Sequence, residues 1–273
     1  RPRPARDAAL TSSEANTGSF TYRLTVALML AAVALLVFGG CARGRTTASQ
    51  SWSGVAVVEN ADGGATAFIG TKEGRLIQLT LASAGGGGQL VQRGRAFGPP
   101  EAEGDTAPAF YGTPTVASGR VFVGGYNGVV YSLNAESLSD ERTWAVDGNP
   151  LAQGIAGGVI PVETPGGLRL VVAASEDSDV GRLYVLDALS LQEHCRYPGE
   201  GLPGIGQVWT TPNVVDGIAY FGDHNHQVHA VSIDDCVSRW DRPVELGGAV
   251  AASPVIVGDD LYVGAFDRTF YAI

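Results

Sequence analysis

The densest group of reactive side chains in the sequence is the segment 223–226, which reads Asp-His-Asn-His, with His229 close behind it. A carboxylate and two imidazoles are ligand types that zinc and copper accept. A complete site would need a third or fourth ligand from elsewhere in the chain. We therefore expect no metal and interpret the segment as a polar turn, keeping Asp223, His224 and His226 as weak metal candidates.

This segment interrupts a sequence pattern that occurs five times. The clearest copy is 113–133, and the last apolar residues of successive copies are 54, 53, 45 and 42 residues apart (Leu79, Leu133, Leu186, Val231 and Ile273). A period in the forties is typical of one four-stranded propeller blade. The pattern therefore predicts an all-β protein, a β-propeller of four-stranded blades.

Each copy contains runs in which Val, Ile, Tyr or Phe occupies every second position, and this period indicates half-buried strands. Asn127-Gly128 predicts a two-residue type I′ hairpin turn, in which both residues take positive φ. Glycines end the second run where neighbouring backbones should crowd: Gly70, Gly124, Gly222 and Gly264. A late aromatic residue suggests a fourth, outer strand that packs against the next blade: Trp144, Tyr197 and Trp240.

The repeat resembles the PQQ-like β-propeller repeat, and within that group it is most similar to BamB-like, lipid-anchored propellers. The resemblance rests on Ser/Thr-Pro-x-Val, then Val-Tyr-Val-Gly, then Gly-x-Val-Tyr-x-Leu, and covers residues 51–273. Such propellers have seven or eight blades. The resemblance therefore implies that five copies are part of a larger ring, incomplete at the carboxyl end; a closed five-blade ring is the alternative.

The amino-terminal segment predicts export. Four arginines precede an apolar run from Leu24 to Phe38, which is shorter than the ~20 residues needed to span a bilayer. Gly39-Gly40-Cys41 then resembles a bacterial lipobox, in which Cys41 carries lipid. We predict a lipoprotein signal peptide at 1–40 and a flexible tether at 41–50; an uncleaved membrane anchor is the alternative. Both place the propeller outside the cytoplasm.

The charge of the exported part argues against nucleic acid as a partner. Residues 1–40 hold 4 of the 18 basic and 2 of the 28 acidic side chains, which leaves 14 basic and 26 acidic, a net charge of −12. A chain this acidic needs a dedicated basic patch to bind polyphosphate, and the sequence has none. The predicted partners are an envelope protein and, through the lipid, a membrane.

Two cysteines remain after Cys41, in a compartment where a disulfide can persist. Cys195 and Cys236 fall near the predicted outer strands of successive blades. Outer strands splay apart, whereas a disulfide needs Cα atoms within about 7 Å. We favour two separate thiols and keep the disulfide as the alternative.

The related quinoprotein dehydrogenases make an enzyme the main rival interpretation. Their alcohol-oxidising members combine a vicinal Cys-Cys pair with a tryptophan, calcium ligands and a base on the propeller axis. The sequence has no Cys-Cys pair. We therefore expect no catalytic residues, no bound PQQ and no other cofactor; the alternative is a quinone- or metal-dependent redox protein.

The turns between the second and third strands should all emerge on one face of the propeller. They differ in charge and aromaticity while the strands beneath them stay alike, which is typical of a binding surface on a rigid scaffold. The candidate interaction face consists of Tyr126, Asn127, His224, His226, Phe266 and Arg268. The sequence thus predicts a non-enzymatic, lipid-anchored scaffold that binds a protein in the cell envelope, as BamB-type assembly factors do.

Overall fold

A computed structural model describes residues 53–60, 64–84, 87–99, 108–145, 154–177 and 179–273. These residues form β-strands, turns and connections, and none of them belongs to a helix. No helix long and apolar enough to cross a bilayer therefore occurs in the described ranges. The predicted signal peptide 1–40, the tether 41–50 and the lipidation residue Cys41 lie outside them.

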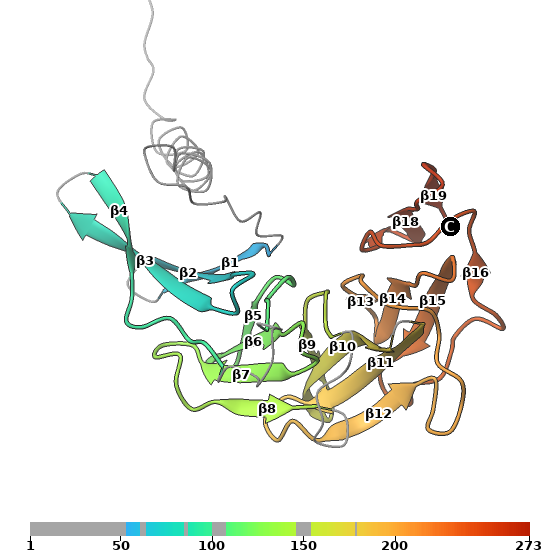
Figure 1. The fold of residues 1–273 in the computed structure, drawn as a ribbon, viewed down its shortest axis with the longest axis horizontal. Helices are drawn as coiled ribbons and strands as arrows, with labels where there is room; N and C mark the ends of the chain where they lie inside the picture. Colours follow the sequence, from blue (N-terminus) through green and yellow to red (C-terminus); the bar gives the residue numbers. More distant parts are fainter. Residues whose placement is uncertain (1–52, 61–63, 85–86, 100–107, 146–153, 178) are drawn as a thin grey trace, which may run out of the picture. The chain divides into compact units, whose positions relative to one another are not determined.

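The strands form five antiparallel sheets that follow one another along the chain (Figure 1). Blade 1 comprises β1 (Val55–Glu59), β2 (Ala65–Gly70), β3 (Leu76–Ala84) and β4 (Gly87–Gln92). Blade 2 comprises β5 (Thr115–Ala117), β6 (Arg120–Gly124), β7 (Val130–Asn134) and β8 (Arg142–Trp144). Blade 3 comprises β9 (Ile160–Thr164), β10 (Gly167–Asp177), β11 (Val180–Asp187) and β12 (Glu193–Tyr197).

Blade 4 comprises β13 (Asn213–Val215), β14 (Ile218–Gly222), β15 (Gln227–Ser232) and β16 (Val244–Glu245), and blade 5 comprises β17 (Val255–Val257), β18 (Asp260–Gly264) and β19 (Phe270–Ala272). In every sheet each strand pairs with the one before it in the chain. The first strands of successive blades also contact one another, β1 with β5, β5 with β9, β9 with β13 and β13 with β17. This is the propeller arrangement that the repeat predicts.

The middle strands of the inner blades are buried on both faces. All five residues of β6 are buried, whereas exposed and partly buried residues alternate along β1. A blade with a neighbour on each side needs apolar side chains at consecutive positions, which explains the run Val121-Phe122-Val123. The simple alternation of an ordinary sheet fails here because both faces are covered by protein.

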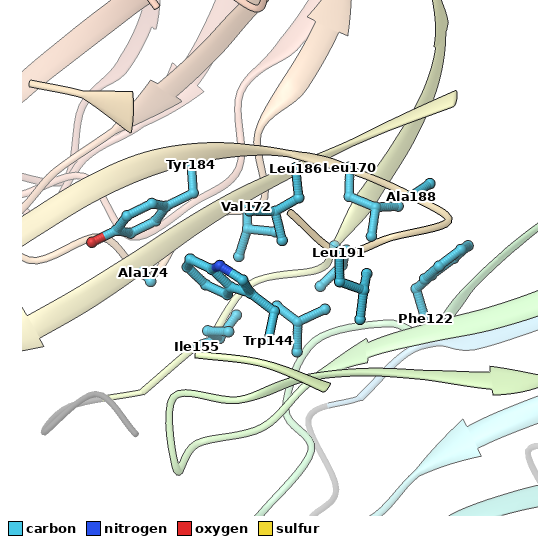
Figure 2. Packing of buried hydrophobic residues seen from close by; sticks show 12 residues of the cluster. Phe122, Trp144, Ile155, Leu170, Val172, Ala174, Tyr184, Leu186, Ala188 and Leu191 are labelled. Carbon is cyan, nitrogen blue, oxygen red and sulfur yellow. The ribbon is translucent and has the colours of Figure 1, made fainter. Parts of the chain in front are cut away.

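The hydrophobic core lies between the blades. Between blades 2 and 3, the buried ring of Trp144 in β8 meets Tyr184 of β11 edge to face, with ring centroids 4.9 Å apart (Figure 2). Phe122, Ile155 and Leu170 belong to the same buried cluster. Corresponding clusters join blades 1 and 2, 3 and 4, and 4 and 5. The ring of Trp144 therefore stabilises the contact between the sheets of blades 2 and 3.

The prediction of a late aromatic on the outer strand is correct in two blades and wrong in the third. Trp144 ends β8 and Tyr197 ends β12, where Tyr197 contacts His229 of the next blade at 5.9 Å. Trp240 instead precedes β16 and lies 6.0 Å from Tyr220 of its own blade. A turn across Ser232–Val237 and a bridge from Val231 to Ser238 occupy the chain before it, which delays the outer strand.

Three of the four strand-ending glycines lie where the next blade approaches closely. A Cβ on Gly124 would lie 2.4 Å from Ile155, one on Gly222 would lie 2.2 Å from Val250, and one on Gly70 would lie 2.8 Å from Phe110. A Cβ on Gly264 would meet nothing closer than 3.9 Å in the described part of the chain. These glycines let the connection before each new blade pack directly on the preceding sheet.

Replacing Gly222 with alanine should therefore lower the free energy of unfolding by about 1–3 kcal/mol, the usual cost of overpacking a core. The added methyl group must displace the β-branched Val250, whose Cβ would lie 2.5 Å away. Gly264→Ala is the matched control, because it adds the same group to the same strand position without a clash. Equal urea midpoints for both variants would contradict the crowding argument.

The turn after β6 differs from the predicted type I′ hairpin. Within it only Gly128 has a positive φ, 78°, and the chain closes by hydrogen bonds from Gly128 N to Gly125 O (2.9 Å) and from Gly125 N to Val129 O (2.8 Å). This is a three-residue loop with the glycine in the left-handed region. Asn127 instead uses its side chain, donating from Nδ2 to the hydroxyl of Tyr131 at 2.7 Å.

Cys195 and Cys236 form a disulfide, with their Cα atoms 5.8 Å apart, so the prediction of two separate thiols is wrong. Cys195 lies on β12, the outer strand of blade 3. Cys236 does not lie on an outer strand: it sits in the turn after β15 with a positive φ of 53°, and its N–H donates to Ser232 O at 3.0 Å. This turn lies against β12, where Asp234 O is also 2.9 Å from Nε2 of His194.

Candidate functional site

The turns between the second and third strands share one backbone shape. In four blades the third loop residue has a positive φ: Gly74 (71°), Gly128 (78°), His226 (68°) and Arg268 (69°). Glycine adopts this region without strain, whereas His226 and Arg268 must be held there by the loop. Blades 4 and 5 have a non-glycine residue in this strained conformation. They thereby place the imidazole of His226 and the guanidinium of Arg268 on the candidate interaction face, where both residues are exposed.

Asp223 does not point toward the other metal candidates. Its carboxylate is fully buried and accepts hydrogen bonds from Gly206 N at 3.1 Å and Gln227 N at 3.0 Å. Its Oδ2 also lies 3.0 Å from Nε2 of the buried His229. These contacts link the turn of blade 4 to the connection that precedes β13. The buried carboxylate therefore stabilises the folded blade.

The same kind of bond recurs in blades 2, 3 and 5. A ring on the third strand contacts a polar side chain of the preceding turn region: Asn127 with Tyr131, Glu176 with Tyr184, and Asp267 with Tyr271 at 2.5 Å. His229 therefore occupies the place of these tyrosines in blade 4. Burial and the adjacent Glu176 carboxylate raise the pKa of Tyr184 far above its ordinary value, so its hydroxyl stays protonated as a donor.

His224 takes no part in the hydrogen bonds of Asp223 described above, and its ring packs instead among other aromatic side chains. Its ring is 4.5 Å from Trp209 and 6.4 Å from Phe266, between centroids. Burial lowers the pKa of His224 below its ordinary value, which keeps the ring neutral at pH 7. Within the described ranges, no three His, Cys, Asp or Glu side chains come close enough to hold a metal ion.

The most distinctive feature of the turn face is a groove of about 760 Å³. Two kinds of chain segment form it: turns between the second and third strands of blades 1, 2 and 5, and connections that lead into the first strands of blades 2 to 5. Its walls carry the rings of Tyr111, Tyr126, Trp209 and Phe266, and Lys72 lies at the turn of blade 1. Side chains from blades far apart in sequence thus meet in one concave surface.

The groove contains part of the predicted interaction face. Tyr126 and Phe266 line it, whereas Asn127, His226 and Arg268 lie outside its lining. His224 does not line the groove either, but its ring packs against the lining residue Trp209. Sequence reasoning missed Tyr111 and Trp209. Their shared position in the repeat could have identified them. Each lies three residues before the proline at the start of its blade, in Tyr111-Gly-Thr-Pro and Trp209-Thr-Thr-Pro.

Comparison with known proteins identifies the family. A family model described as the outer membrane protein assembly factor BamB matches residues 42–273. The chain belongs to the BamB family. No curated protein matches its sequence.

A solved BamB structure supports the propeller fold of this chain. The crystal structure of BamB from Moraxella catarrhalis is 18% identical, with a TM-score of 0.54 over 81% of this chain and 60% of that one. Two computationally designed proteins, Ika4 and Ika8, give TM-scores of 0.47 and 0.49 at 14% and 12% identity. They cover 63% and 79% of this chain and 94% and 69% of their own.

The BamB assignment confirms the predicted family and the all-β propeller class. This chain spans 60% of the length of the Moraxella BamB structure. At 18% identity, that likeness establishes the fold alone.

Proposed function

We propose that this chain is an exported, lipid-anchored scaffold that binds a protein partner in the cell envelope through its turn face. The single observation that carries the proposal is the varied turn face above a repeated blade framework, with the exposed side chains of Tyr126, His226, Phe266 and Arg268 on it. Aromatic and arginine side chains are the usual anchors of protein interfaces. Membership of a family described as outer membrane protein assembly factors supports a role in envelope protein assembly.

Export and anchoring rest on the amino-terminal sequence, with Cys41 as the residue that carries lipid. The disulfide between Cys195 and Cys236 supports the same placement, since disulfides persist mainly outside the reducing cytoplasm. Metabolic labelling with a palmitate analogue tests the anchor: the wild-type chain should incorporate the label, and Cys41→Ser should not.

The scaffold needs no catalytic group and no cofactor. The buried carboxylate of Asp223 already accepts two backbone hydrogen bonds and contacts His229, so it serves the fold. A quinone- or metal-dependent redox protein remains the rival, and it predicts a stoichiometric chromophore or metal in the purified full chain. Visible absorbance and elemental analysis of that preparation would decide against the scaffold if either were found.

Site-specific photo-crosslinking in the native cell tests partner binding. A benzophenone amino acid at His226 or Arg268 samples the exposed turn face outside the groove. Leu189, which is 59% exposed in the turn at the opposite end of β11, is the control position. We expect one specific envelope protein to be captured from the two face positions and not from Leu189. Equal capture at all three positions would refute a dedicated face.

A further inference from the structure

The groove on the turn face is lined by aromatic rings, small residues and one lysine, and this lining indicates what the groove binds. We propose that it takes an extended polypeptide segment in which an aromatic side chain stands next to a carboxylate. This inference deepens the proposed scaffold function and rests on it, because it assigns the chemistry of the partner segment.

The rings of the groove are partly exposed yet fixed by contacts with one another. Tyr111 and Tyr126 meet edge to face with centroids 5.2 Å apart, and the His224 ring backs Trp209 at 4.5 Å. Tyr126, Trp209 and Phe266 keep 37%, 38% and 68% of their surface exposed. Rings held in place before binding lose little conformational entropy when an apolar side chain docks on them.

Small residues leave room between these rings. The connections into blades 2, 3 and 5 contribute Gly112, Ala156, Gly157 and Ala251 to the lining. The glycines are required by packing: a Cβ on Gly112 would lie 2.1 Å from Gly157 O, and one on Gly157 would lie 2.4 Å from Thr210 O. Close packing of these connections thus yields a concavity with aromatic walls and a volume suited to a few side chains.

The charge of the groove is opposite to that of the chain. The whole sequence carries a net charge of −10, but Lys72 is the one charged residue in the lining, and it is exposed. No ion pair among the described residues involves Lys72. A carboxylate of a bound polypeptide would be attracted to the Lys72 ammonium group, while an aromatic side chain of the same polypeptide packs against the rings of the groove.

A glycan also stacks on aromatic rings, but the polar groups of the groove fit it less well. Sugar hydroxyls are best held by side chains that accept and donate several hydrogen bonds, such as carboxylates and amides. The lining holds none of these, and its hydroxyls include Thr211, whose Oγ1 already accepts from Gly158 N at 2.7 Å. The observations therefore favour a polypeptide.

The test is selection of a random peptide library displayed on phage against the purified full chain, with an oligosaccharide array probed in parallel. The paired variants are Phe266→Ala and Phe270→Ala: both phenylalanines lie in blade 5 and are 68% and 72% exposed, but only Phe266 lines the groove. We expect selected peptides to carry Phe, Tyr or Trp beside Asp or Glu. Their affinity should fall about tenfold or more in Phe266→Ala and in Trp209→Ala, and stay unchanged in Phe270→Ala.

Lys72→Ala should weaken the selected peptides about two- to fivefold, the range of an exposed ion pair, and added salt should reduce the wild-type affinity toward that of the variant. Peptides that bind equally to wild type and Phe266→Ala, a basic or purely aliphatic consensus, or selective binding of oligosaccharides would each overturn the inference. Crosslinking at Arg268 with no groove-dependent peptide would leave the scaffold proposal standing and reject the groove assignment alone.

Discussion

Replacing Asp223 with alanine should lower the free energy of unfolding by about 3–5 kcal/mol, the range for breaking a buried charged contact. The buried carboxylate accepts from Gly206 N and Gln227 N and contacts Nε2 of His229. Its removal leaves the buried N–H of Gly206, the buried Nε2 of His229 and the partly buried N–H of Gln227 without their partner. Nδ1 of His229 already lacks one. Each unsatisfied group costs about 1–3 kcal/mol. Urea denaturation of the purified chain, followed by tryptophan fluorescence, measures the loss.

Two further variants separate this role from metal binding. Asp267→Ala removes a partly exposed carboxylate that bonds Tyr271 in blade 5, and it should cost much less because water replaces the lost contacts. Asp223→Asn keeps a carbonyl acceptor and should fall between wild type and Asp223→Ala. Stoichiometric zinc or copper in the wild type that disappears in Asp223→Asn would show that the carboxylate is a ligand and contradict the structural role.

The fold could be predicted from the sequence because the same sequence features recur in successive blades. The interval between copies matches the size of a four-stranded sheet, and glycine ends the second strand in four of the five blades. Gly124 and Gly222 illustrate the rule, since each is followed by a connection whose Ile155 or Val250 occupies the space of a Cβ. Such signals are local in sequence and recur, so five weak copies add up to one firm prediction.

The details that the sequence could not supply depend on side-chain contacts that no local sequence pattern specifies. Asn127-Gly128 is compatible with two turn types, and the bond from Asn127 to Tyr131 accompanies the longer loop. Cys236 reaches Cys195 from a turn that lies against β12, and the spacing of the two cysteines in the sequence does not reveal this contact. The groove needs Trp209 and Phe266 from different blades, and their proximity follows only from the arrangement of the blades.

Removing the Cys195–Cys236 disulfide should destabilise the propeller by about 2–4 kcal/mol. The bond joins residues 41 apart in sequence, and a loop of that length restricts the unfolded chain in the chain-entropy account. It also lies beside the buried cluster between blades 3 and 4, which contains Cys236, Phe221 and Val231. We expect the double variant Cys195→Ala/Cys236→Ala to unfold at lower urea.

Reduction supplies the matched control for this effect. A thiol reductant should shift the wild-type urea midpoint toward that of the double variant and leave the double variant unchanged. Peptide mapping after alkylation of the unfolded, non-reduced chain should find Cys195 and Cys236 unmodified if they are paired. Alkylation of both residues in protein isolated from the envelope would show separate thiols instead. The same chain produced in a reducing cytoplasm should carry both thiols and match the double variant in stability, because the bond forms only where an oxidant is available.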